Sequence, residues 1–76
     1  MGVSFELPSS TLVQVRIFDL AGRSVATLVD EVLGAGHHQA AWNGRDALGS
    51  RATPGLYFLR LQADGHRMTR TVVLIE

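Results

Sequence analysis

The histidines and paired carboxylates of this chain are spaced in a way that predicts neither catalysis nor metal binding. His37 and His38 are adjacent in a strand-like segment, so their side chains point to opposite faces and cannot both bind one metal ion. His66 follows a turn signal, with no carboxylate at a recognisable ligand spacing. Asp30 and Glu31 are the one pair of neighbouring carboxylates, and they also fall on opposite faces of a strand.

The candidate oxygen ligands and nucleophiles likewise predict neither a metal site nor catalysis. Asn43, Asp46 and Asp19 could form an oxygen cage for calcium, but the Asp-x-Asp-x-Asp-Gly spacing of an EF-hand loop is absent. Asx turns that stabilise the loops are the favoured interpretation. The chain has no cysteine, and no serine stands in a Gly-x-Ser-x-Gly elbow. We therefore predict a protein that is not an enzyme and that uses no cofactor and no metal.

Sugar binding is the remaining small-molecule class. It needs planar aromatic side chains on an exposed face, and Trp42 and Tyr57 are the only candidates. Both fall on strand faces that the apolar pattern assigns to the core. No small-molecule substrate is expected.

Length and composition indicate one small domain held together by its apolar core. The 76 residues contain no cysteine, and seven arginines balance seven acidic residues without any lysine. The arginines are spread along the chain, which argues against nucleic-acid binding. No apolar run approaches the ~20 residues of a membrane span. We interpret residues 1–2 as an expression start, so that the natural protein was longer at its N-terminus, and residues 3–76 as a single domain.

The first half of the chain has the period-two pattern of β-strands. Residues 3–7 alternate and stop at Pro8, which predicts an edge strand. The next strand places an apolar face inward, followed by an Asp-x-x-Gly turn from Asp19 to Gly22. Residues 24–31 are less regular, with Val25 and Val29 on one face and Leu28 on the other. A helix over this segment is the rival interpretation; its β-branched residues favour a strand.

The second half is organised around the stretch from Trp42 to Tyr57. Trp42 ends a strand that starts at Gly36, and Tyr57 lies on the inward face of the strand after the loop. We expect a loop carbonyl to accept a hydrogen bond from the indole N–H. The next turn is an Asp64-Gly65 pair, which predicts a two-residue hairpin with positive φ at both positions.

The last strand, residues 67–75, ends in four consecutive apolar residues. That run is more typical of a strand covered on both faces than of an exposed edge, and which set of alternate residues faces the core stays open. Together the segments predict an all-β fold, an antiparallel two-sheet immunoglobulin-like β-sandwich of about seven strands.

The order of these motifs resembles a known family of immunoglobulin-like domains. The resemblance covers nearly the whole chain and rests on the run from Val15 to Val25 with Leu28, on Gly36-x-His38-x-Ala40-x-Trp42-Asn43-Gly44-Arg45-Asp46 with Gly49, and on Pro54-Gly55-Leu56-Tyr57-Phe58. Two related groups share such a domain: the Ig-like domain of the flagellar hook-capping protein, and the C-terminal sorting domain of proteins exported by the type IX secretion system of Bacteroidetes and their relatives.

The resemblance implies a non-catalytic C-terminal domain that sorts a secreted multidomain bacterial protein or attaches it to the cell surface after export through the periplasm. Its implied partners are the secretion or attachment machinery, or a neighbouring domain of the same chain. A structural accessory module and a flagellar hook-assembly scaffold are the alternatives. Sorting domains commonly carry an Asn-Pro motif before the first strand and end in a basic residue, whereas here that motif is missing and the chain ends at Glu76.

Two sets of residues follow from this interpretation. The structural signature consists of aromatic residues that we expect in the core and of residues that we expect to fix the turns: Trp42, Asn43, Gly44, Asp46, Gly49, Gly55, Tyr57, Asp19 and Gly22. The candidate partner-recognition strand consists of the last residues of the chain: Thr71, Val72, Val73, Leu74, Ile75 and Glu76.

Overall fold

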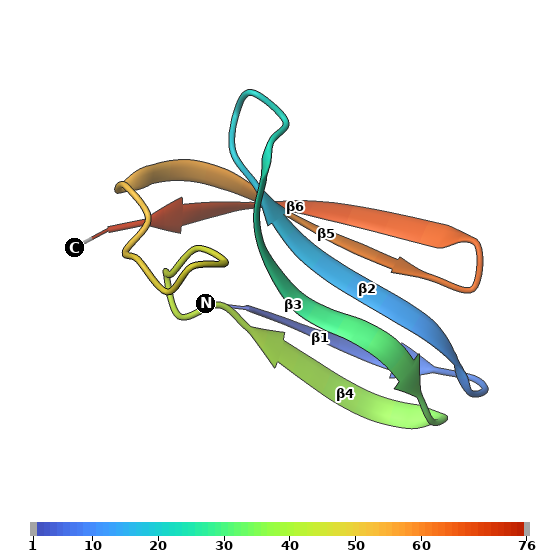
Figure 1. Ribbon diagram of the computed structural model, residues 1–76. Helices are drawn as coiled ribbons and strands as arrows, with labels where there is room; N and C mark the ends of the chain where they lie inside the picture. The colour runs from blue at the N-terminus through green and yellow to red at the C-terminus, as the bar shows by residue number, and fades with distance from the viewer. Residues whose placement is uncertain (1, 76) are drawn as a thin grey trace.

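The fold consists of two antiparallel β-sheets (Figure 1). The computed structural model describes residues 2–75. Its strands are β1 (Gly2–Leu7), β2 (Thr11–Phe18), β3 (Ser24–Leu33), β4 (Gly36–Ala41), β5 (Gly55–Ala63) and β6 (His66–Leu74). The predicted all-β, two-sheet architecture is confirmed, with six strands in the described chain where about seven were expected. The segment that could have been a helix is strand β3.

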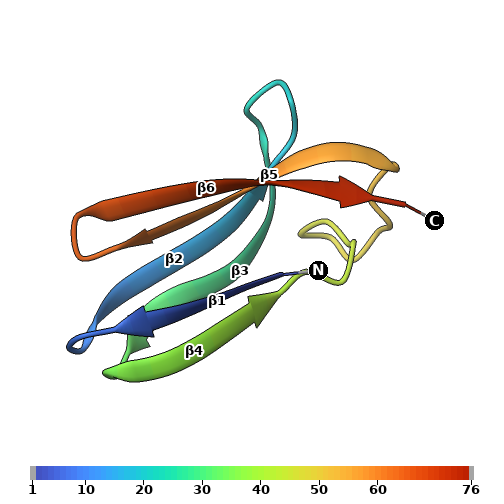
Figure 2. The same ribbon diagram turned by 180° about the vertical axis from the view of Figure 1, so that it is seen from behind.

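The two sheets differ in size. β1 pairs with β4 in the smaller sheet, and the larger sheet has the order β3-β2-β5-β6. Figure 2 shows the smaller sheet from behind, with β1 and β4 side by side. The loop that joins β4 to β5, residues 42–54, holds most of the structural signature and is called the signature loop below. In both views β1 begins and β6 ends near this loop, so the signature loop and the last strand share one end of the molecule.

The core lies between the sheets and follows the predicted alternation. Val13, Val15 and Ile17 of β2 are fully buried, and β5 contributes its predicted inward face. β1 and β4 close the core from the other side. The remaining buried apolar residues are Val3, Leu7, Ala26, Ala40, Trp42, Tyr57, Leu59, Leu61 and Ala63.

The turns between strands have the backbone conformations that their residues predict. Asp64 and Gly65 have φ of 50° and 75°, as a two-residue hairpin with positive φ at both positions requires. Gly22 and Gly49 both have φ of 87° and end Asp-x-x-Gly turns. Each donates its N–H to the carbonyl of the aspartate three residues earlier, Asp19 or Asp46, at 3.0 Å.

The irregular pattern of β3 results from two breaks in its register with β2. Val15 pairs with Val29 but Arg16 pairs with Thr27, so Leu28 is an extra residue on β3. A second extra residue, Val25, stands where the pairing passes from Ala26 to Ser24. Bulges of this kind reverse which residues face inward. Ala26 is buried, and Val25, Leu28 and Val29 are all half-buried against the core, so the expected placement of Leu28 on the face opposite Val25 and Val29 was wrong.

β6 is an edge strand, and the expectation that it is covered on both faces was wrong. It pairs with β5 alone, and the opposing sheet has two strands against four. Met68, Val72 and Leu74 turn toward the core and are half-buried, which settles the open question of parity. Val73 is 55% exposed and Ile75 80%. An apolar run in sequence was therefore a poor indicator of burial here.

Candidate functional site

Trp42 anchors the loop that joins β4 to β5. Its side chain is 4% exposed, and its ring meets that of Tyr57 edge to face, with centroids 5.0 Å apart. The indole Nε1 donates a hydrogen bond of 2.9 Å to the carbonyl of Arg45, as the sequence predicted. Trp42 thus fills the core and holds the first turn of the loop in the same contact.

Tyr57 fixes the other end of this loop. Its ring is buried, and its hydroxyl donates a hydrogen bond to the carbonyl of Thr53, four residues earlier. Immunoglobulin-like domains use a tyrosine corner in a similar way, with a hydroxyl bonded to the backbone a few residues upstream. The polar atoms of both aromatic side chains are therefore engaged within the protein.

We expect Tyr57→Phe to lower the free energy of unfolding by about 0.5–1.5 kcal/mol, the net contribution of one hydrogen bond. The ring and its contact with Trp42 remain in this variant, so the loss reports the hydroxyl alone. Urea denaturation followed by circular dichroism measures it. Unchanged stability would mean that water replaces the hydroxyl at Thr53 without cost.

Inside the loop, Asn43 and Asp46 serve as turn residues. Asn43 Oδ1 accepts a hydrogen bond of 3.0 Å from the N–H of Arg45. Asp46 Oδ1 accepts two, from the N–H groups of Leu48 at 2.9 Å and Ser50 at 3.0 Å. These side-chain oxygens accept hydrogen bonds from backbone N–H groups of the loop. Within residues 2–75, no group of three or more His, Cys, Asp or Glu side chains could hold a metal ion. The predicted Asx turns are present.

Asp19 repeats this arrangement in the turn between β2 and β3. Its Oδ1 accepts from the N–H groups of Ala21 at 3.0 Å and Arg23 at 2.9 Å, and its Oδ2 pairs with Arg23 Nε at 3.1 Å. The hydrogen bond from the Arg23 N–H lowers the pKa of Asp19 most, and the Arg23 side chain and the Ala21 N–H lower it further. Its carboxylate form is thereby favoured in the folded protein.

This lowered pKa predicts an acid-dependent contribution to stability. Because the folded pKa lies below the unfolded one, the contribution is fully present above the unfolded pKa and is lost as pH falls through the folded pKa. Asp19→Asn should therefore melt below the wild type at neutral pH, and the gap should close in acid. Melting curves across an acid pH series test this, and a gap that stays constant with pH would contradict it.

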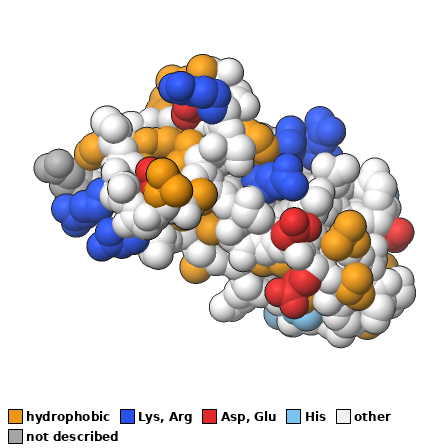
Figure 3. All heavy atoms as spheres, in the orientation of Figure 1, with side chains coloured by type: hydrophobic (Ala, Val, Ile, Leu, Met, Phe, Trp, Pro, Cys, Tyr) orange, Lys and Arg blue, Asp and Glu red, His pale blue; other side chains and the backbone are white. Residues whose placement is uncertain are grey.

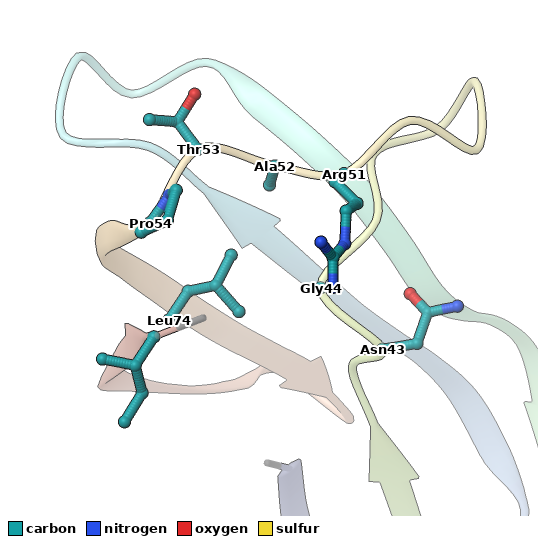
Figure 4. Close-up of a pocket in the computed structure, with 8 residues that line it drawn as sticks. Asn43, Gly44, Arg51, Ala52, Thr53, Pro54 and Leu74 are labelled. Carbon is teal, nitrogen blue, oxygen red and sulfur yellow. The ribbon is translucent and has the colours of Figure 1, made fainter.

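Gly44 brings the loop against the last strand. It is buried with φ of 80°, and a Cβ added there would lie 3.2 Å from Leu74 Cδ1. Beside it is a depression lined by the loop residues and the end of β6 (Figure 4). Figure 4 shows Leu74 on one side of it and Arg51 and Asn43 on the other, with Ala52, Thr53 and Pro54 above.

The lining of this depression limits the chemistry that it can perform. Its lining offers one guanidinium, one amide and one hydroxyl among apolar groups. Among residues 2–75, the lining includes no carboxylate, histidine or thiol to serve as a base or a nucleophile. The arrangement supplies neither general acid–base nor nucleophilic catalysis.

The histidines lie apart from this loop. His38 faces inward, stacks on Phe5 with centroids 5.7 Å apart and donates through Nε2 to the Gly34 carbonyl at 2.7 Å. His37 lies on the opposite, exposed face, with Nδ1 3.1 Å from Glu6 Oε1. His66 is the exposed first residue of β6. The prediction that the adjacent pair cannot share a metal is consistent with these positions.

The candidate partner-recognition strand, residues 71–76, includes two exposed apolar residues, Val73 and Ile75. Thr71, Val73 and Ile75 are exposed, whereas Val72 and Leu74 turn inward; Glu76 lies outside the described residues. Within residues 2–75, no helix is both long and apolar enough to cross a membrane.

The structure also brings together residues that sequence reasoning did not single out. Arg16 of β2 and Arg60 of β5 stand directly opposite each other on the outer face of the larger sheet. Their outward positions follow from the alternation of each strand, but their pairing depends on the register between strands far apart in sequence.

Comparison with known proteins identifies the domain type. The model of a family described as the FlgD Ig-like domain matches residues 1–66, which reach the first residue of β6. That family is typically non-catalytic. No curated protein and no solved structure matches the chain significantly.

Proposed function

Because the chain belongs to the FlgD Ig-like domain family, we propose that it is the C-terminal sorting or surface-attachment domain of a secreted multidomain bacterial protein. In this role the domain catalyses nothing. Its partner is an export or attachment machinery of the type IX kind, and the protein passes through the periplasm to the medium or the cell surface. The signature loop maintains the fold, and β6 is the part that the machinery contacts.

The observation that carries this proposal is the contrast between β6 and the loop. The loop's aromatic and acidic groups are engaged in hydrogen bonds within the protein. β6 instead pairs with β5 alone among residues 2–75, and Val73 of β6 and Ile75, the residue after β6 ends, are exposed. An open edge with alternating exposed side chains is the arrangement that strand addition uses, with main-chain hydrogen bonds for affinity and side chains for specificity.

A fusion tests the proposal. Residues 3–76 are placed behind a signal peptide and a reporter, in a host that has the export system and in the same host without it. We expect the reporter outside the cell or on its surface only where the system is present. A reporter that remains in the periplasm of the complete host would refute the proposal.

A structural accessory module is the second candidate, favoured by Leu56 and Ile75, which are exposed apolar residues near the same end of the larger sheet. Such a module would pack on a neighbouring catalytic domain. Comparison of the melting temperature of the parent protein with and without this domain decides between the two, because a sorting tail leaves that temperature unchanged.

A flagellar hook-assembly scaffold is the third candidate, and the family assignment supports it. The segment that precedes Val3 in the full-length precursor separates it from the others. A hook-capping N-terminal region would favour the scaffold, whereas a large secreted enzyme or adhesin would favour sorting.

A further inference from the structure

The outer face of the larger sheet holds two arginines in an unfavourable arrangement. Arg16 and Arg60 are direct cross-strand partners, and both are half-buried. Like charges directly opposite each other destabilise a sheet. The Arg60 guanidinium carbon lies 4.3 Å from the centroid of the Phe18 ring, a cation–π contact that holds it over the sheet. This contact keeps the Arg60 cation on the face that also holds Arg16.

Nothing in the described chain neutralises this pair. The ion pairs found among residues 2–75 are Arg23 with Asp19 and His37 with Glu6, neither of which includes Arg16 or Arg60. Arg16 Nε is buried and has no hydrogen-bond partner among the described residues. A buried N–H donor without an acceptor is costly, and more so when it belongs to a cation. The pair thus lacks an acceptor that bears negative charge.

Apolar and cationic groups continue from this pair across β5 and β6. A shallow depression beside it is lined by Phe18, Phe58, Arg60, Arg67 and Thr69, together with residues of the turn between β2 and β3. Asp19 also borders it, but that carboxylate is already bonded within its own turn. Figure 3 shows arginine side chains gathered over the region where Figure 1 places β2, β5 and β6.

We propose that this face binds a segment of a separate protein in which acidic residues alternate with apolar ones. One carboxylate of the segment would accept hydrogen bonds from Arg16 and Arg60, and a second would pair with Arg67. Apolar side chains of the segment would cover the exposed parts of Phe18 and Phe58. A small inorganic anion could accept hydrogen bonds from the arginines, but it would make no apolar contact with Phe18 and Phe58. The proposal concerns the outer face of the larger sheet and not the hydrogen-bonding edge of β6, and it does not depend on the sorting role.

A peptide titration tests the proposal on the whole chain. The probe is a synthetic peptide of alternating Glu and Val, and its matched control has Gln in place of Glu. Backbone amide shifts of the isotopically labelled protein report the affinity and the face. We expect shifts on β2, β5 and β6 with the Glu peptide and at least about tenfold weaker binding of the Gln peptide, as loss of charge-assisted hydrogen bonds implies.

Variants distinguish binding at this face from nonspecific attraction of the acidic peptide to any arginine. Arg16→Met and Arg60→Met should each weaken the Glu peptide about tenfold, whereas Arg51→Met, an exposed arginine of the loop, should leave its affinity within twofold. Equal binding of the two peptides would overturn the proposal, and so would equal losses in all three variants. Displacement of the peptide by sulfate at equal charge would overturn it in favour of a simple anion site. Peptide-independent dimers in sedimentation, abolished by Arg16→Met, would show that the occupant is a second copy.

A stability measurement distinguishes a binding role from a structural one. If Arg16 serves a partner, Arg16→Met removes a half-buried cation that faces a like charge and carries an unpartnered Nε–H, and it should leave the melting temperature unchanged or raise it. A melting temperature several degrees below that of the wild type would show that Arg16 supports the fold, and would overturn the assignment.

Discussion

Trp42→Ala is expected to lower the free energy of unfolding by about 3–5 kcal/mol, the usual cost of removing a large buried aromatic side chain. The indole is almost completely buried, contacts Tyr57 edge to face and is bonded to the Arg45 carbonyl, so the variant loses packing and a hydrogen bond together. A 76-residue domain has a total stability of only about 4–11 kcal/mol. Urea denaturation followed by far-ultraviolet circular dichroism, which does not depend on tryptophan fluorescence, measures the loss.

Leu48→Ala is the matched control for this experiment. Leu48 belongs to the same loop and is 92% exposed, so its truncation should change stability by no more than about 0.5 kcal/mol. A Trp42→Ala melting temperature only a few degrees below that of the wild type would contradict the assignment of Trp42 as the residue that holds the loop to the core.

Replacing both Val73 and Ile75 by threonine is expected to abolish export of the reporter fusion while the domain stays folded. Both side chains are exposed, and threonine keeps the β-branched shape that suits a strand. The melting temperature should therefore stay close to that of the wild type, but the apolar side chains offered to an added strand are gone. Cell fractionation measures the reporter, and a thermal melt of the purified variant confirms the fold.

The control places the same change on other strands. Leu12 of β2 and Val32 of β3 are also exposed apolar residues, and their joint replacement by threonine should leave export intact. If the β6 variant is exported as well as the wild type, β6 is not the recognised element. If both variants fail, export responds to surface polarity rather than to this strand.

Features that depend on local chemistry could be predicted from the sequence. The inward faces of β2 and β5 follow from strict alternation, and the Asp64-Gly65 hairpin follows from the backbone preferences of its two residues. The hydrogen bond from Trp42 to a loop carbonyl was predictable because a buried indole N–H requires an acceptor. The turn roles of Asn43 and Asp46 likewise follow from side chains that bond to the backbone two residues on.

Features that depend on the pairing of strands far apart in the chain could not be predicted from the sequence. The bulge at Leu28 becomes visible only when β3 is aligned with β2, so alternation along β3 alone could not predict that Leu28 packs against the core together with Val25 and Val29. Residues 72–75 are apolar whether β6 is central or at an edge, and its place at the edge depends on the strand order of its sheet, in which it pairs with β5 alone. The opposition of Arg16 and Arg60, 44 positions apart, likewise depends on the register between β2 and β5.

The most direct measurement is the distribution of the reporter between the periplasm and the outside of the cell, in a host with the export system. Fusions with the intact domain and with its Trp42→Ala variant are compared at equal expression. The sorting role predicts that the intact fusion reaches the surface or the medium and that the variant, which lacks the anchor of its fold, is retained. Retention of the intact fusion in the periplasm would contradict it.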